Sequence, residues 1–418
     1  MDMLYNRRLF SNFISLSVVQ GINFLIPVLV TPYVISKVGI EGIGVIAIAQ
    51  TVMIYLSTLT DYGFNVTATK EITLCKNDRL RTSAVFFTVL ASKLIITALL
   101  FILLMILAFF IPVIQHHFIL YLLGFTFVIG QSLSVNWFFL GMEKMHFITI
   151  SALFSRLIFV VLLFIFIQKK EDDIFFLFFL GTGNIVASLL SIFVAINLFK
   201  LKFLRPVWAD ISNEIKKGWQ VTVSVLSLNA YLLSGIFILR FFTNDLMVGY
   251  YSIAARIFFA ARQVLAVFSE AVYPQICQLS LKGKEATRLF FRKVYLPFLL
   301  MTFLGCILLF IFSPQVVYIF IKEETAIPVL LLRMLSFVPV IVCFHIPAYQ
   351  LLLAFDRKKS YLRIFGLATI MNIAANIWLV NEWGATGTVL CIMITELFIT
   401  VGLNRELYKN NLSGFIGG

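Results

Sequence analysis

The sequence predicts an all-α membrane protein with twelve transmembrane helices in two six-helix lobes, and with both termini in the cytoplasm. Three observations predict this fold: apolar segments follow one another along the whole chain, basic residues gather in every second connector, and the two halves share a short repeat. Hydrophobic residues make up 61% of the 418 positions and charged residues only 13%. Soluble proteins carry roughly 25% charged residues, so we expect this chain to fold in lipid.

Each apolar segment is long enough to cross the hydrocarbon layer, which takes roughly 20 residues of α-helix. Alternation of polar and apolar residues, the pattern of a transmembrane barrel, is not visible in these segments. We place the helices at 13–35, 42–64, 85–111, 118–140, 147–167, 174–199, 219–241, 246–272, 294–313, 327–353, 364–381 and 385–403.

The basic residues predict the orientation of these helices. With a cytoplasmic N-terminus, the inner connectors hold 23 Lys and Arg residues and the outer connectors only five, namely Lys37, Lys169, Lys170, Arg240 and Lys322. The positive-inside rule therefore places both termini in the cytoplasm. The net charge of +13 is explained by topology and contact with anionic membrane lipids, so we expect no nucleic-acid partner.

The longest inner connector, residues 200–218, divides the chain into an N-terminal lobe of residues 1–206 and a C-terminal lobe of residues 207–418. Residues 44–49 match residues 249–254 at three of six positions. The two segments lie six helices apart, so they cross the membrane in the same direction and indicate parallel repeats, as in duplicated transporters.

Known signatures of soluble and catalytic sites are missing from the sequence. No nucleotide-binding loop or nucleophile elbow is present, and the adjacent His116 and His117 offer too few ligands for a metal. We therefore expect no cofactor, no metal and no catalytic residues. The short outer connectors also argue against a polysaccharide polymerase or ligase, which would need a larger loop to hold its substrate.

Charged residues inside the apolar helices are the candidate functional residues, because a charge at mid-bilayer costs roughly 2.5–3.5 kcal/mol on insertion scales. Such a residue faces a cavity that holds water or cargo, or else it forms a structural ion pair or extends to the interface. The candidates for a cationic substrate-binding cavity are Arg256, Arg156, Arg262, Arg333 and Lys93. Arg256 lies near the middle of its helix and should share a face with Gln263 and Glu270.

Acidic residues are fewer in the helices. Asp61, Glu270 and Glu396 are the carboxylates placed to couple transport to an ion gradient, with Glu270 the first candidate. Because basic residues outnumber them, the predicted cavity is cationic and favours an anionic cargo.

Two groups of motifs resemble a known family. The first covers Pro32–Gly44, Ala47–Gln50, Asp61–Phe64 and Thr69–Ile72, and the second covers Gly249–Ala254, Tyr273-Pro274, Gly384–Gly387 and Glu396. Their order and spacing resemble the Wzx-type O-antigen and polysaccharide flippases of the multidrug/oligosaccharidyl-lipid/polysaccharide (MOP) exporter superfamily. The resemblance extends over nearly the whole chain and implies a MATE-like, two-lobed fold that works by alternating access.

The resemblance also implies a cargo and a location. The cargo would be an undecaprenyl-pyrophosphate-linked oligosaccharide, the O-antigen repeat unit, moved from the cytoplasmic to the periplasmic leaflet of a bacterial inner membrane, with other polysaccharide assembly proteins as further partners. Two alternatives stay open: a cation-coupled multidrug or solute exporter of the MATE type, and a membrane-embedded polymerase or ligase. Drug exporters often carry an acid in the first helix, where this chain has only Gln20 and Asn23 as strongly polar interior residues.

The charge asymmetry generates a prediction about topology. Reporter fusions after Lys170 and Lys322 should read as periplasmic, and fusions after Lys217 and Arg292 should read as cytoplasmic. Paired alkaline phosphatase and fluorescent protein fusions measure this directly. A reversed signal at either pair would contradict the predicted orientation.

Overall fold

The computed structural model describes residues 2–322, 326–355 and 357–415, and for residues 2–20, 22–25, 224, 228, 231, 232, 274 and 358 it describes only the backbone. The described residues form helices and no strands, which confirms the predicted all-α membrane fold. By their contacts they form two compact units, Met1–Asn229 and Ala230–Gly418. The boundary falls inside one helix, α9 (Trp208–Phe242), whereas the lobe division at 206/207 rests on the connector sequence and stays a prediction.

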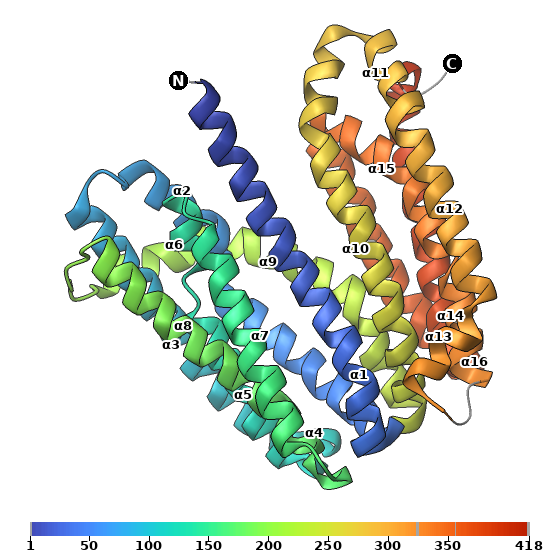
Figure 1. The fold of residues 1–418 in the computed structure, drawn as a ribbon, viewed down its shortest axis with the longest axis horizontal. Helices are drawn as coiled ribbons and strands as arrows, with labels where there is room; N and C mark the ends of the chain where they lie inside the picture. The colour runs from blue at the N-terminus through green and yellow to red at the C-terminus, as the bar shows by residue number, and fades with distance from the viewer. Residues whose placement is uncertain (1, 323–325, 356, 416–418) are drawn as a thin grey trace. The chain divides into compact units, whose positions relative to one another are not determined.

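Unit 1 contains eight α-helices before α9 and one short 3₁₀ helix (Figure 1). They are α1 (Asp2–Asp61), α2 (Phe64–Cys75), α3 (Arg79–Phe110), α4 (Pro112–His116), α5 (Phe118–Leu133), α6 (Asn136–Gly141), α7 (His146–Phe166), η1 (Lys170–Phe175) and α8 (Phe176–Leu198).

Unit 2 contains the end of α9 and the helices that follow it. They are α10 (Asp245–Lys282), α11 (Lys284–Phe290), the π-helical turn η2 (Phe291–Tyr295), α12 (Leu296–Ile311), α13 (Ser313–Phe320), α14 (Ala326–Leu335), α15 (Val338–Ala354), α16 (Lys358–Lys409) and the 3₁₀ turn η3 (Ser413–Phe415).

Two very long helices are each interrupted by a glycine. A straight helix with the 60 residues of α1 would be about 90 Å long, three times the thickness of the hydrocarbon layer. At Gly39 the backbone leaves helical geometry, with φ 79° and ψ 176°, and Gly384 interrupts α16 in the same way, with φ 53° and ψ −131°. These positive φ values favour glycine, and both breaks fall between helices that the sequence predicts separately.

Nine helices in the described part of the chain are long and apolar enough to cross a membrane, which makes this a multi-pass membrane protein. Two of these segments, Ile26–Cys75 and Lys359–Lys409, contain the glycine breaks and comprise 50 and 51 residues. The count of twelve spans and the cytoplasmic location of the termini stay predictions.

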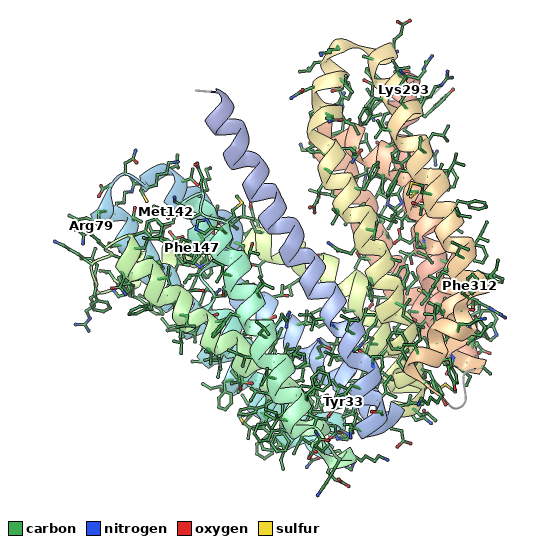
Figure 2. All side chains as sticks on the ribbon, viewed as in Figure 1. Tyr33, Arg79, Met142, Phe147, Lys293 and Phe312 are labelled. Atoms are coloured by element: carbon green, nitrogen blue, oxygen red, sulfur yellow. The ribbon has the colours of Figure 1, made fainter. Side chains whose placement is uncertain are left out.

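The side chains labelled in Figure 2 mark the ends of the helices within each unit. Figure 2 shows Arg79, Met142 and Phe147 at one end of unit 1 and Tyr33 at the opposite end. The first three flank connectors predicted to be cytoplasmic, and Tyr33 precedes a connector predicted to be outside. In unit 2, Lys293 precedes α12 and Phe312 follows it, so the two residues mark the ends of this helix.

A charged cluster joins the first part of α9 to α2 within unit 1. Lys217 on α9 forms ion pairs with Glu71 on α2 and, at 2.7 Å, with Glu214. Burial raises the pKa of the Glu214 carboxyl. This cluster holds the end of the long connector against the helices that precede it.

Small residues let the helices of unit 1 approach closely. Helix α8 packs against both α5 and α7, and an added Cβ at Gly130 would lie 2.6 Å from the Cβ of Asn184. An added Cβ at Gly183 would collide with the backbone carbonyl of Ser155 on α7. Close approach of this kind is the usual way in which helices pack in lipid.

The close approach of α8 to α7 at Gly183 predicts that alanine lowers the stability of the protein at Gly183 but not at Gly305. Gly183→Ala should lower the melting temperature of the purified protein, since overpacking costs about 1–3 kcal/mol. Gly305→Ala is the matched control, because no atom lies within 4 Å of an added Cβ there. Thermal unfolding in detergent measures both, and equal melting temperatures for the two variants would contradict the packing described here.

Candidate functional site

A buried ion pair joins α1 to α3 in unit 1. The Lys93 ammonium on α3 lies 2.9 Å from Oδ1 of Asp61, the last residue of α1, and the Lys93 side chain is only 1% exposed. The side-chain amide of Gln131 on α5 donates to the other oxygen of Asp61 over 2.8 Å. Asp61 therefore has both a cationic and a neutral partner within the protein.

Lys93 also stabilises the end of α5. Its ammonium donates to the backbone carbonyls of Gln131 and Ser134, over 2.9 Å and 3.2 Å. Helix α5 ends at Leu133 and α6 begins at Asn136, so these carbonyls lie where a helix lacks internal partners and where a cation is favoured. The ammonium thus fixes the break between the two helices.

A polar cavity of about 240 Å³ lies beside this network, between α5, α6, α7 and α8. Polar residues dominate its wall and include Gln131, Ser134, Asn136, Ser155, Arg156 and Asn184. Gln131 and Ser134 belong both to the cavity and to the Lys93 network. The ion pair and the cavity are therefore parts of one structural unit.

Hydrogen bonds fix the orientation of the cavity side chains. The Ser155 hydroxyl on α7 donates to Oδ1 of Asn184 on α8 over 2.6 Å. The Ser188 hydroxyl on α8 donates to the Gly130 carbonyl on α5 over 3.1 Å. Arg156, one residue after Ser155, brings a positive charge to the same wall.

Unit 2 holds a second buried ion pair. Arg262 on α10 lies 2.6 Å from Oε1 of Glu396 on α16, and the Glu396 side chain is fully buried. On α15, Nδ1 of His345 lies 3.1 Å from the Thr400 hydroxyl of α16. Because that hydroxyl donates to the Ile341 carbonyl, Nδ1 of His345 is the donor in this contact.

The remaining predicted residues lie apart from these two groups. Arg333 on α14 donates from Nε to the Ser313 hydroxyl over 3.0 Å, and its guanidinium lies 5.4 Å from the ring centre of Phe310. Arg256 is half-buried midway along α10, and Glu270 is exposed near the end of the same helix. The side chains of Gln20 and Asn23 lie outside the described part of the chain.

The structure therefore brings Asp61 and Lys93 together with the Arg156 cavity, and Arg262 together with Glu396. Sequence reasoning did not find Gln131 or Asn184. A signal was present for the cavity: Ser151 and Ser155 on α7, and Asn184 and Ser188 on α8, are each spaced by four residues. That spacing places each pair on one face of its helix.

Comparison with known proteins places the chain in a family. Residues 9–280 match the model of a family described as "Polysaccharide biosynthesis protein". The chain belongs to this family. The predicted resemblance to polysaccharide exporters is thereby confirmed.

Two curated relatives extend the match to nearly the whole chain. Both are named "Putative O-antigen transporter". The relative from Escherichia coli (strain K12) is 24% identical over 401 residues, which cover 96% of each chain. The relative from Shigella dysenteriae is 24% identical over 396 residues, which cover 93% of this chain and 98% of its own.

Solved structures of MOP transporters share the fold. An inward-facing multidrug resistance MATE family transporter of the MOP superfamily superposes with a TM-score of 0.66 at 17% identity, over 96% of this chain and 95% of its own. The lipid II flippase MurJ, in an inward closed conformation, gives a TM-score of 0.67 at 14% identity, over 99% and 89%. At these identities the likeness concerns the fold alone.

The Lys93 network predicts that two lysine substitutions lower the free energy of unfolding by different amounts. Lys93→Met should destabilise the protein by about 1–3 kcal/mol, because Asp61, which is 21% exposed, loses its cation and the carbonyls of Gln131 and Ser134 lose their donor. Lys76→Met is the matched control, since Lys76 pairs with Glu143 at 2.8 Å but both side chains are exposed, at 36% and 57%. An exposed pair contributes at most about 1 kcal/mol.

Thermal unfolding of the purified variants in detergent tests this difference. The double variant Asp61→Asn with Lys93→Met should regain part of the lost stability, because it removes the uncompensated charge. A Lys93→Met variant as stable as Lys76→Met would contradict the structural role of the pair.

Proposed function

We propose that the protein is a flippase that moves a lipid-linked oligosaccharide across the bacterial inner membrane. In this proposal twelve helices span the membrane with both termini in the cytoplasm, and the cargo is an undecaprenyl-pyrophosphate-linked O-antigen repeat unit. The cargo passes from the cytoplasmic to the periplasmic leaflet by alternating access. The two curated relatives, by name O-antigen transporters that match along nearly their whole length, support this cargo.

The observation that carries the proposal is the presence of arginines inside apolar helices of a polysaccharide biosynthesis protein. An anionic headgroup needs charge-assisted donors within the membrane, and a guanidinium can bind two phosphate oxygens at once. Arg256 is the proposed phosphate contact. It lies 11 residues after Asp245, the first residue of α10, and therefore about 16 Å along the helix, near the middle of a bilayer about 30 Å thick.

The proposed energy source is an ion gradient or the concentration difference of the cargo. Coupling to ions would need a carboxylate that binds and releases a cation. Asp61 and Glu396 each have a basic partner inside the protein, whereas Glu270 is exposed. We therefore keep Glu270 as the first coupling candidate. Asp61 and Glu396 already have a basic partner in place of a transported cation. Their ion pairs therefore argue against the alternative of a cation-coupled drug exporter.

Substitution of Arg256 tests the proposed function in cells. Arg256→Ala should abolish surface polysaccharide and cause lipid-linked precursor to accumulate, while the protein level stays normal. Arg256→Lys should restore transport only partly, because lysine keeps the charge but loses the bidentate geometry. Surface polysaccharide and extracted precursor are measured in a strain that lacks the chromosomal gene.

The matched control is Arg363→Ala, since the Arg363 side chain is 64% exposed. It should support wild-type levels of polysaccharide. Full activity of Arg256→Ala would reject the role of Arg256, and normal surface polysaccharide in the strain without the gene would reject the proposed function.

A further inference from the structure

The cavity beside Arg156 has the composition of a carbohydrate site. A sugar presents many hydroxyl groups, each of which both donates and accepts hydrogen bonds, so its site needs donors and acceptors side by side. The cavity wall offers hydroxyls, carboxamides and one guanidinium on four helices. Helices position such groups more precisely than loops do.

The hydrogen bonds within the wall leave specific groups for a ligand. Ser155 and Ser188 use their hydroxyl protons to contact Asn184 and the Gly130 carbonyl, so their oxygen lone pairs remain as acceptors. Asn184 accepts at Oδ1, which leaves the two N–H bonds of its amide as donors. Gln131 donates to Asp61 and keeps its carbonyl oxygen as an acceptor. The cavity wall thus offers both donors and acceptors to a ligand.

The charge of the cavity does not match a pyrophosphate. Arg156 is the one charged residue among the described residues that line it. The neighbouring Lys93 is neutralised by Asp61 at 2.9 Å. A pyrophosphate bridge carries more than one negative charge, whereas the other residues of this wall are uncharged. A single guanidinium instead suits the oxygens of a sugar and its polar substituents.

The size of the cavity limits the ligand to a single ring. Its volume of about 240 Å³ lies below the roughly 300–1,000 Å³ of sites for drug-sized ligands. One monosaccharide fits this limit, whereas a whole oligosaccharide repeat unit exceeds it. The Lys93 network fixes the end of α5, and with it Gln131 and Ser134 in the cavity wall.

We propose that this cavity binds one monosaccharide residue of the lipid-linked glycan, with Arg156 and Asn184 as donors and Ser155, Ser188 and Gln131 as acceptors. This inference rests on the proposed function and deepens it. It assigns Arg156 to the sugar and leaves the pyrophosphate to Arg256. The lobe that holds the cavity therefore selects cargo by its sugar.

Three substitutions test the cavity, and one serves as a matched control. Ala152→Leu fills space at a residue of the wall, Arg156→Gln removes the charge, and Ser188→Ala removes a hydroxyl. The control is Ser191→Ala. Ser191 lies on the same helix and also donates to a backbone carbonyl, that of Ala187 at 2.8 Å, but it is not part of the cavity wall.

The measurement is equilibrium binding to the purified full-length protein in detergent. The probes are undecaprenyl pyrophosphate and its derivatives with a single glucose, galactose or N-acetylglucosamine. Wild type should bind at least one glycosylated probe more tightly than the sugar-free probe. Arg156→Gln and Ala152→Leu should weaken binding of that probe about tenfold, and Ser188→Ala about threefold, as expected for lost hydrogen bonds. The control should bind as wild type does.

Binding of the sugar-free probe separates the possible outcomes. Unchanged affinity for this probe in the three variants shows that they are folded and that the cavity contacts only the sugar. Equal affinity of wild type for probes with and without sugar, equal loss of both in the variants, or no effect of the variants would overturn the inference but leave the proposed function intact. If wild type bound none of the probes, the proposed function would fail and the inference with it.

Discussion

The ion pair between Lys93 and Asp61 is the interaction on which the rest of unit 1 depends. In lipid an isolated charge is expensive, so both residues need a partner within the protein. One ammonium meets this need for the end of α1 and at the same time satisfies the carbonyls where α5 ends. Three helices are therefore held in register at the point where the polar cavity begins.

The charged residues inside the helices differ in their surroundings. Lys93 and Arg262 each form a buried ion pair, with Asp61 and Glu396, and such pairs add little net charge to their surroundings. Arg156 lines a cavity of uncharged polar groups, and Arg256 lies midway along an apolar helix. The two lobes thus offer different chemistry, with sugar recognition proposed for the first and phosphate recognition for the second.

Much of the fold could be predicted from the sequence, because lipid imposes a length and a composition on each helix. The breaks at Gly39 and Gly384 fall between helices predicted at 13–35 and 42–64, and at 364–381 and 385–403. The partners of the buried charges could not be predicted. Lys93 and Asp61 lie 32 positions apart, and Glu396 is on a different helix from Arg262, so each pairing depends on tertiary packing. The cavity depends on side chains from four helices. The four-residue spacing of polar residues on α7 and on α8 indicates a polar face on each helix, but not that the two faces meet.

Transport of a defined lipid in reconstituted vesicles tests the central claim most directly. Proteoliposomes that contain the wild-type protein should move an undecaprenyl-pyrophosphate-linked oligosaccharide between leaflets faster than protein-free vesicles, as measured by access of an external sugar-cleaving enzyme. They should not accelerate the movement of a phosphatidylcholine analogue that carries the same reporter. An unchanged rate for the oligosaccharide lipid, or equal acceleration of both lipids, would contradict the account.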